Sequence, residues 1–117
     1  MVVIVDDDES MRVAIEGLMK AVGLTARGFA SAEEFLQSGE ERRVGCLIAD
    51  VWMPGMSGLE LQAALRAAQH PVPTIFITAH ADERTRREAL RGGALDFVAK
   101  PFDDEALVAS VRTALAS

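Results

Sequence analysis

The 117-residue sequence contains one cysteine, two histidines and two lysines. The single cysteine, Cys46, excludes an internal disulfide and any zinc site that needs several cysteines. His70 and His80 stand ten residues apart, so they do not form a His-Glu-x-x-His metal motif. Lys20 precedes Ala and Lys100 precedes Pro, whereas the lysine of a phosphate-binding P-loop precedes Ser or Thr. The absence of these motifs excludes several common classes of enzyme.

Long hydrophobic runs are also missing. No apolar stretch approaches the ~20 residues of a membrane-spanning helix. The N-terminal run 1–5 is shorter than the apolar stretch of ~7–15 residues in a signal peptide. We therefore expect a cytoplasmic protein without a membrane partner, which agrees with the single cysteine.

The charge balance is acidic, with twelve Lys and Arg against eighteen Asp and Glu, and a net charge of -6. This balance argues against direct binding of nucleic acid by this chain. Four of the acids are consecutive, at positions 6–9. The length is that of one domain, given a prior of ~150 residues per domain, and we assign residues 1–117 to it.

Short apolar runs alternate with longer segments of helical periodicity, which is typical of a parallel α/β sheet. The more polar second run favours an edge position and hence the strand order 2-1-3-4-5. The prediction is a doubly wound, flavodoxin-like sheet of five strands with five helices. The expected strands are 2–5, 25–29, 46–49, 74–77 and 94–99. Capping boxes at Ser31 and Ser57 predict two of the helix starts, and a charged helix is expected over 82–90.

Reactive side chains follow these predicted strands directly. Asp6 and Asp7 follow the first strand, and Asp50 follows the third. Because ligands of open parallel sheets bind at the carboxyl ends of strands near the switch in strand order, these three carboxylates should converge. Carboxylates this close repel one another unless a cation such as Mg²⁺ compensates them. Thr78 and Lys100 end the fourth and fifth strands and add groups suited to phosphoryl oxygens, so the set favours phosphoryl transfer to an aspartate.

Four motifs follow one another along the chain. They are Val5-Asp6-Asp7-Asp8-Glu9, Asp50-Val51-Trp52-Met53-Pro54-Gly55-Met56-Ser57-Gly58, Thr78-Ala79 and Lys100-Pro101-Phe102. Each motif alone is weak, but four in this order are highly specific. With these motifs the sequence resembles a response-regulator receiver domain of bacterial two-component systems over essentially its whole length. The flanks at 31–36 and 96–102 are most similar to the FixJ-like class, whose members usually carry a helix-turn-helix output domain.

The resemblance implies a role for each residue of the site. Asp50 would accept a phosphoryl group from a phosphohistidine on a sensor histidine kinase. Asp7, Asp50 and the backbone carbonyl of Trp52 would bind Mg²⁺ (or Mn²⁺), and Asp6 would do so mainly through water. Thr78 and Lys100 would contact the phosphoryl oxygens, and the peptide bond between Lys100 and Pro101 would be cis.

The resemblance also implies a switch. Phosphorylation would draw Thr78 inward and let Phe97 rotate, which remodels the surface of the fourth helix, fifth strand and fifth helix. This surface would control an output such as transcription, through a C-terminal DNA-binding domain, and would form a homodimer when phosphorylated. The protein would be a signalling phosphoacceptor that catalyses only its own phosphotransfer and dephosphorylation, not an enzyme.

The sequence also allows other functions and other roles for single residues. Asp6-x-Asp8-x-Ser10 resembles the motif of haloacid-dehalogenase-type phosphatases, with Asp6 as nucleophile and Asp8 as acid/base. A degenerate receiver would act only as an interaction module. Asp8 is also a candidate helix cap, Phe97 a candidate core aromatic, and His80 a rim residue that either affects the phosphoryl lifetime or has no role.

Overall fold

The computed structural model describes residues 1–116. Its centre is a five-stranded parallel sheet with the order β2-β1-β3-β4-β5, which confirms the predicted topology. The strands are β1 Val2–Val5, β2 Ala26–Phe29, β3 Cys46–Ala49, β4 Thr74–Thr78 and β5 Asp96–Ala99. The helices are α1 Glu9–Ala21, α2 Ala32–Ser38, α3 Gly58–Ala67, α4 Glu83–Arg91 and α5 Asp104–Leu115.

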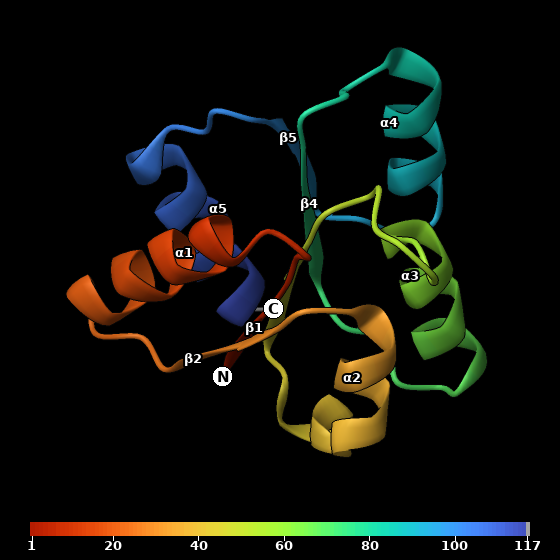
Figure 1. Cartoon of the computed structure of the whole chain (residues 1–117), viewed down its shortest axis with the longest axis horizontal. Coiled ribbons are helices and arrows are strands. Elements are labelled where there is room, and N and C mark those ends of the chain that lie inside the picture. The colour runs from red at the N-terminus through yellow and green to blue at the C-terminus, as the bar shows by residue number, and fades with distance from the viewer. Residues whose placement is uncertain (117) are drawn as a thin grey trace.

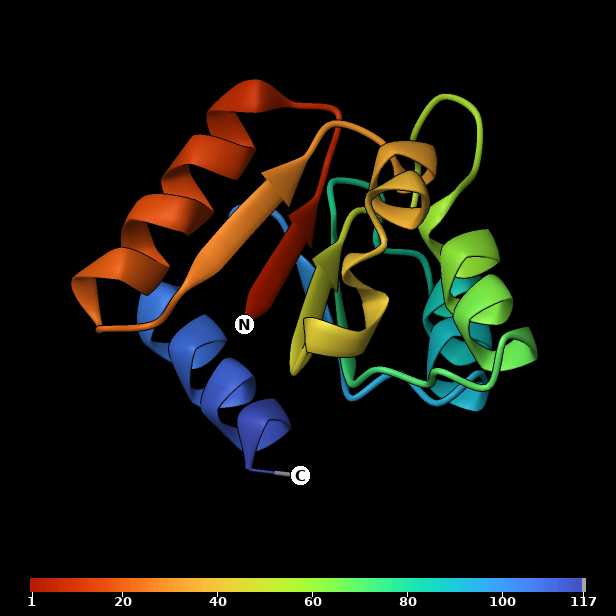
Figure 2. The ribbon, with the colours of Figure 1, turned by 90° about the horizontal axis from the view of Figure 1, so that it is seen from below.

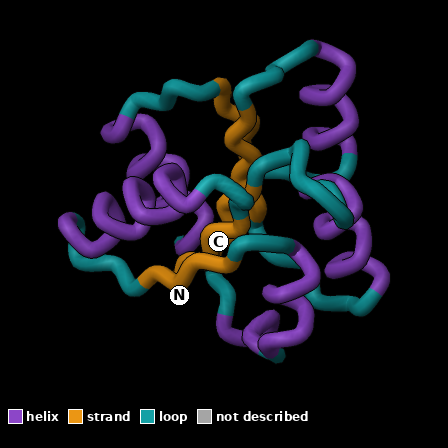
Figure 3. Tube along the Cα trace, viewed as in Figure 1, coloured by secondary structure: helices purple, strands orange, loops and turns teal. Residues whose placement is uncertain are grey.

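Helices cover both faces of the sheet. Helices α1 and α5 lie on one face, and α2, α3 and α4 lie on the other (Figures 1 and 3). The strands supply both cores because successive side chains point to opposite faces. In β1, Val3 packs with the cluster under α2, α3 and α4, whereas Ile4 packs with the cluster under α1 and α5. All four residues of β1 are therefore buried, as the continuous apolar run predicts.

The more polar strand β2 lies at an edge of the sheet and pairs only with β1. Its side chains alternate in exposure, and only Phe29 at its end is buried. Arg27 reaches Glu40 in a surface ion pair of 3.3 Å. The edge position follows from this pattern, because a strand covered on both faces cannot keep a charged side chain.

The structure differs from the predictions at several element ends: β2 begins at Ala26 instead of residue 25, β4 ends at Thr78 instead of residue 77, and α4 spans Glu83–Arg91 instead of 82–90. β5 begins at Asp96 instead of residue 94, because the amide of Ala94 donates to the carbonyl of Ala89 in the turn after α4. A short 3₁₀ helix, η1 (Glu40–Arg43), was not expected. Within residues 1–116, only Ser57 forms a complete capping box; the Ser31 hydroxyl accepts the Glu34 amide without the reciprocal bond.

Helix α4 is charged on its outer surface. Three exposed ion pairs run along it, Arg84–Glu88, Arg86–Glu83 and Arg87–Glu83. Exposed ion pairs contribute little to stability. This side of α4 is therefore a solvated surface. In the part of the chain that the structure describes, no helix has the length and apolarity to cross a membrane.

Candidate functional site

The candidate site lies where the strands end. All five strands point toward one edge of the sheet, and the loops after them gather there (Figure 2). Val5 and Ala49 are register partners on neighbouring strands, so Asp6 and Asp50 start adjacent loops. One oxygen from each of Asp6, Asp7 and Asp50 lies within 4.8 Å of the other two. The convergence expected of these three carboxylates is present in the fold.

Lys100 joins two of these carboxylates. Its Nζ donates to Asp50 Oδ2 at 2.9 Å and to Asp6 Oδ2 at 3.1 Å. The side chains are well shielded, with exposed fractions of 15% for Lys100, 11% for Asp50 and 4% for Asp6. Because charges in such a place are poorly hydrated, the ammonium stabilises both carboxylates. The peptide bond between Lys100 and Pro101 is cis, as the resemblance implies.

The other carboxylate oxygens are held by backbone amides. Asp6 Oδ1 accepts the amide of Asp8 at 2.9 Å, and Asp50 Oδ1 accepts the amide of Trp52 at 3.1 Å. Asp7, by contrast, is exposed and makes no side-chain hydrogen bond within residues 1–116. The site thus combines two immobilised carboxylates with one whose oxygens are free to bind a ligand.

Burial and the neighbouring charges have opposite effects on the pKa values of Asp6 and Lys100. Burial raises the pKa of Asp6, and the hydrogen bonds from Asp8 and Lys100 only partly oppose that effect. For Lys100, burial lowers the pKa, but the hydrogen bonds to Asp50 and Asp6 outweigh burial and leave the pKa raised. Lys100 therefore stays charged at neutral pH, while burial makes the ionised form of Asp6 less favourable than that of an exposed carboxylate.

The donor set fits a hard divalent cation. Mg²⁺ binds oxygen ligands at about 2.1 Å in an octahedron, so its ligands lie about 3–4 Å apart. Three carboxylate oxygens within 4.8 Å of one another need only a small closure to meet that geometry. Cys46, the one thiol, is buried in β3, and burial raises its pKa to about 12, so it supplies no ligand.

The remaining predicted residues line the same edge or lie nearby. Thr78 ends β4, is buried, and accepts the amide of His80 on Oγ1 at 3.3 Å. The Trp52 side chain is half exposed and lies in the loop after Asp50. Phe97 packs against the core under α2, α3 and α4. Within residues 1–116, the Thr78 hydroxyl makes no hydrogen bond to the three carboxylates.

Sequence reasoning missed two supporting residues. Arg12 Nη1, from α1, donates to the carbonyl oxygen of Asp6 at 2.7 Å. Glu33 Oε2, from α2, accepts the amide of Met56 at 3.1 Å. Arg12 follows the Asp8 cap by one helical turn, and that spacing was the available signal. Glu33 and Met56 are 23 residues apart, so no local sequence pattern could have predicted their contact.

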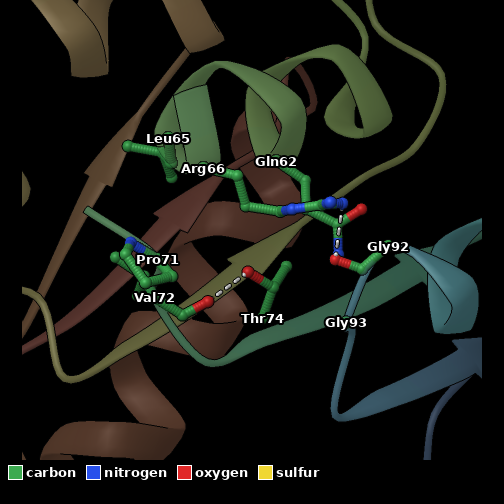
Figure 4. Close-up of a pocket in the computed structure, with 8 residues that line it drawn as sticks. All are labelled: Gln62, Leu65, Arg66, Pro71, Val72, Thr74, Gly92 and Gly93. Atoms are coloured by element: carbon green, nitrogen blue, oxygen red, sulfur yellow. Dashed lines mark hydrogen bonds between the residues drawn. The ribbon is translucent and has the colours of Figure 1, made fainter. Parts of the chain in front are cut away.

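A cavity beside α3 lies away from these residues. It has a volume of about 250 Å³ and lies between α3 and the turn after α4 (Figure 4). Polar groups in its wall bond within the protein: Arg66 Nη1 donates to the Gly92 carbonyl at 3.1 Å, and Thr74 Oγ1 donates to the Val72 carbonyl at 2.8 Å. None of the predicted site residues lines it. Its lining consists of Gln62, Leu65, Arg66, Pro71, Val72, Thr74, Gly92 and Gly93.

The phosphatase alternative is not supported. It requires Asp8 as an acid/base, but Asp8 is the N-cap of α1. Its Oδ1 accepts the amides of Ser10 at 2.9 Å and Met11 at 3.4 Å. Asp8 thus serves the helix N-terminus, as its capping interpretation predicts.

Comparison with known proteins points to one family. The family pattern described as response regulator receiver domain matches residues 2–112. Response regulator protein TmoT of Ectopseudomonas mendocina is 42% identical over 115 residues, which cover 98% of this chain and 52% of TmoT. Transcriptional regulatory protein FixJ of Azorhizobium caulinodans is 41% identical over 112 residues, which cover 96% of this chain and 53% of FixJ. The chain spans about half the length of the curated relatives it matches.

Solved structures agree with the sequence matches. The crystal structure of a response regulator receiver protein from Burkholderia phymatum is similar to this chain with a TM-score of 0.84 and 42% identity. The match covers 98% of this chain and 94% of that protein. The shared topology and the extent of the sequence match lead to one conclusion. The chain belongs to the response regulator receiver domain family.

Proposed function

We propose that this domain, residues 1–117, is the phosphoacceptor of a cytoplasmic two-component system, and that Asp50 receives a phosphoryl group from a sensor histidine kinase. One observation carries the proposal. Asp50 shares the ammonium of Lys100 with Asp6, at a sheet edge where Asp7 completes a set of three carboxylates. A buried carboxylate beside a lysine and a cation site has the surroundings that a phosphoryl group needs.

The proposed chemistry is a displacement at phosphorus. A carboxylate oxygen of Asp50 attacks the phosphoryl group, a P–O bond forms, and the P–N bond to the kinase histidine breaks. Asp6, Asp7, Asp50 and the Trp52 carbonyl would hold Mg²⁺ (or Mn²⁺), which supplies positive charge to the transferring oxygens. Lys100 Nζ already lies 2.9 Å from Asp50 Oδ2 and would donate to the oxygens of the phosphoryl group once it is bound there. The Thr78 hydroxyl would donate to the same oxygens. The domain catalyses only its own phosphorylation and dephosphorylation.

The proposed output is a change in the surface formed by α4, β5 and α5. Thr78 and Phe97 would be the switch residues, since Thr78 ends β4 and Phe97 lies on the neighbouring β5. Leu90 and Leu95 are exposed on this side, with exposed fractions of 37% and 40%, which supports a homodimer through α4 and β5. The relatives are about twice as long, which supports a C-terminal DNA-binding output domain and control of transcription. This domain itself would not bind nucleic acid.

A phosphodonor assay tests the proposal. The wild-type chain is incubated with acetyl phosphate and Mg²⁺, and intact mass is measured. The expected result is a gain of one phosphoryl group that requires Mg²⁺ and is lost in Asp50→Asn. The Asp8→Asn variant is the control, because Asp8 caps α1 and should leave phosphorylation intact. A folded wild-type protein whose mass does not change would rule the proposal out in favour of a degenerate receiver.

A further inference from the structure

The loop between β3 and α3, residues 51–57, is fastened at its base. The amide of Trp52 donates to Asp50 Oδ1 at 3.1 Å, and the amide of Gly58 donates to the Val51 carbonyl at 2.9 Å. This loop contains the Trp52 carbonyl, the proposed backbone ligand of the cation. The conformation of the loop therefore bears directly on the cation site.

The tip of the same loop is held from outside. The amide of Met56 donates to Glu33 Oε2 at 3.1 Å, and Glu33 lies in the first turn of α2. Gly55, the neighbouring residue, lies against the same carboxylate oxygen. It has a φ of +77°, and a Cβ added to it would collide with the Glu33 carboxylate. Position 55 thus combines the left-handed backbone that favours glycine with close approach of Glu33.

Acidic residues are common in the first turn of a helix, so the presence of an acid at position 33 does not by itself indicate a contact with the loop. Negative charge in the first turn of a helix is favoured by the helix dipole. Glu34 supplies the same charge in the same turn, but its side chain makes no hydrogen bond within residues 1–116. The dipole explains either acid, whereas the contact with Met56 and Gly55 belongs to Glu33 alone.

We propose that Glu33 is a positioning residue for the cation site, acting through the loop 51–57. By accepting the Met56 amide it keeps the loop in one conformation, so the segment that carries Trp52 is ordered before the cation binds. If the loop were mobile, the apparent dissociation constant would rise as the inverse of the fraction of chains in which the loop is correctly placed. This inference rests on the proposed function, since it assumes that the cation binds at Asp6, Asp7 and Asp50.

The first test needs no metal. Amide hydrogen exchange of the loop 51–57 is compared in EDTA for wild type, Glu33→Ala, Glu33→Gln and Glu34→Ala. Glu33→Ala should speed exchange of the Met56 amide, whereas Glu34→Ala should not. Glu33→Gln should stay near wild type, because its side-chain carbonyl still accepts the amide. Unchanged exchange in Glu33→Ala would overturn the proposal.

The second test measures Mg²⁺ affinity through the fluorescence of Trp52, the one tryptophan of the sequence. Outer partners of metal ligands typically change affinity by about 10–100-fold, and this exposed contact should change it by about three- to tenfold in Glu33→Ala. Glu33→Gln and Glu34→Ala should stay within about twofold of wild type, because each removes one negative charge but keeps the loop contact. Equal weakening in Glu33→Gln and Glu33→Ala would show a pure charge effect and overturn the proposal.

The outcomes separate this inference from the proposed function. If the wild type does not respond to Mg²⁺ at all, the proposed cation site fails and the positioning role fails with it. If the wild type responds and Glu33→Ala binds Mg²⁺ equally well, only the positioning role fails. Should Glu33→Ala fold poorly, Glu33→Asp provides a second route, because it keeps the negative charge but is one methylene shorter and draws the carboxylate away from the Met56 amide. Glu33→Asp should then weaken Mg²⁺ binding, and unchanged affinity would count against the proposal.

Discussion

At the scale of the residue, Asp6 is the most constrained carboxylate of the site. It is 3% exposed and shares Lys100 with Asp50. Burial raises its pKa despite the hydrogen bonds from Asp8 and Lys100, so the folded protein holds its proton more tightly than the unfolded chain does. Folding stability should therefore fall as pH rises from the ordinary value of 3.8 through the folded pKa.

We expect Asp6→Asn to raise the thermal midpoint at neutral pH in EDTA, because it removes a charge that the folded state disfavours. The gain should be roughly 1 kcal/mol, or about 4 °C. The gain should shrink as pH falls toward the ordinary value of 3.8, because Asp6 of the folded wild type then becomes protonated and loses its charge. Thermal unfolding followed by circular dichroism measures both values. Asp7→Asn, at an exposed position, is the control, and an Asp6→Asn midpoint at or below wild type would contradict this account.

At the scale of the element, two helical glycines have opposite physical roles. Gly58 begins α3, and a Cβ there would collide with the Asp50 carbonyl oxygen and come within 3.0 Å of the Phe76 ring. Gly17 lies inside α1, and a Cβ there would meet nothing within 4 Å. The close packing of α3 onto the end of β3 therefore requires glycine, whereas α1 does not.

Alanine substitution should separate these two roles. Gly17→Ala should stabilise the protein by up to about 1 kcal/mol, since alanine is the better helix former. Gly58→Ala should destabilise it by about 1–3 kcal/mol, because overpacking outweighs the same gain in propensity. Urea unfolding measures both free energies. Stabilisation by Gly58→Ala would show that α3 can move away from Asp50 at no cost.

A second feature at the element scale joins α3 to the end of α4. Arg66 donates to the Gly92 carbonyl (Figure 4), and Gln62 Nε2 donates to the buried Ala89 carbonyl at 3.4 Å. The last carbonyls of a helix lack partners within the helix itself. Side chains of α3 thus satisfy carbonyls at the C-terminus of α4.

Arg66→Met should loosen that helix end while keeping much of the apolar stem. We expect a loss of about 0.5–1 kcal/mol, because the contact is exposed, and faster amide exchange at residues 91–94. Arg43→Met removes the same charge from η1, far along the chain from α4, and serves as the control. Equal exchange at 91–94 in the two variants would mean that Arg66 does not hold the end of α4.

At the scale of the whole molecule, the cluster of three carboxylates that could hold a cation exists only in the folded chain. Asp6 and Asp50 are 44 residues apart in sequence, and the parallel pairing of β1 with β3 brings them together. Much of the net charge of -6 is therefore concentrated at one edge of the sheet, where mutual repulsion opposes folding. A ligand that binds this edge must stabilise the fold, because it has no comparable site in the unfolded chain.

Mg²⁺ should accordingly raise the thermal midpoint. At a free concentration of about 100 times the dissociation constant, the added stability is about 2.7 kcal/mol. Differential scanning calorimetry at constant ionic strength measures the shift, with NaCl as the matched salt. Asp7→Asn should abolish most of it, since Asp7 offers the unengaged carboxylate of the three. An equal shift in wild type and Asp7→Asn would place the cation elsewhere.

The sequence by itself determined the five strands, the α-helices between them and their order. Continuous apolar runs mark β1, β3 and β4, the more polar segment 25–29 marks an edge strand, and Asp50, Thr78 and Lys100 stand where strands end. These features are local, because each is a period or a position within one segment. The start of β5 and the helix η1 escaped prediction, since hydrogen bonds in turns decide them.

Only the tertiary structure decided how the site is supported. Lys100 bridges Asp6 and Asp50, Arg12 holds the Asp6 carbonyl, and Glu33 holds the loop at Met56. The last of these contacts joins segments with no shared periodicity, and its direction depends on how α2 packs beside the loop. The burial that raises the pKa of Asp6 likewise arises only when the sheet and its helices close around it. The sequence places Asp6, Asp50, Thr78 and Lys100 at strand ends. The packing of the helices on the sheet decides how deeply these side chains are buried and which groups they contact.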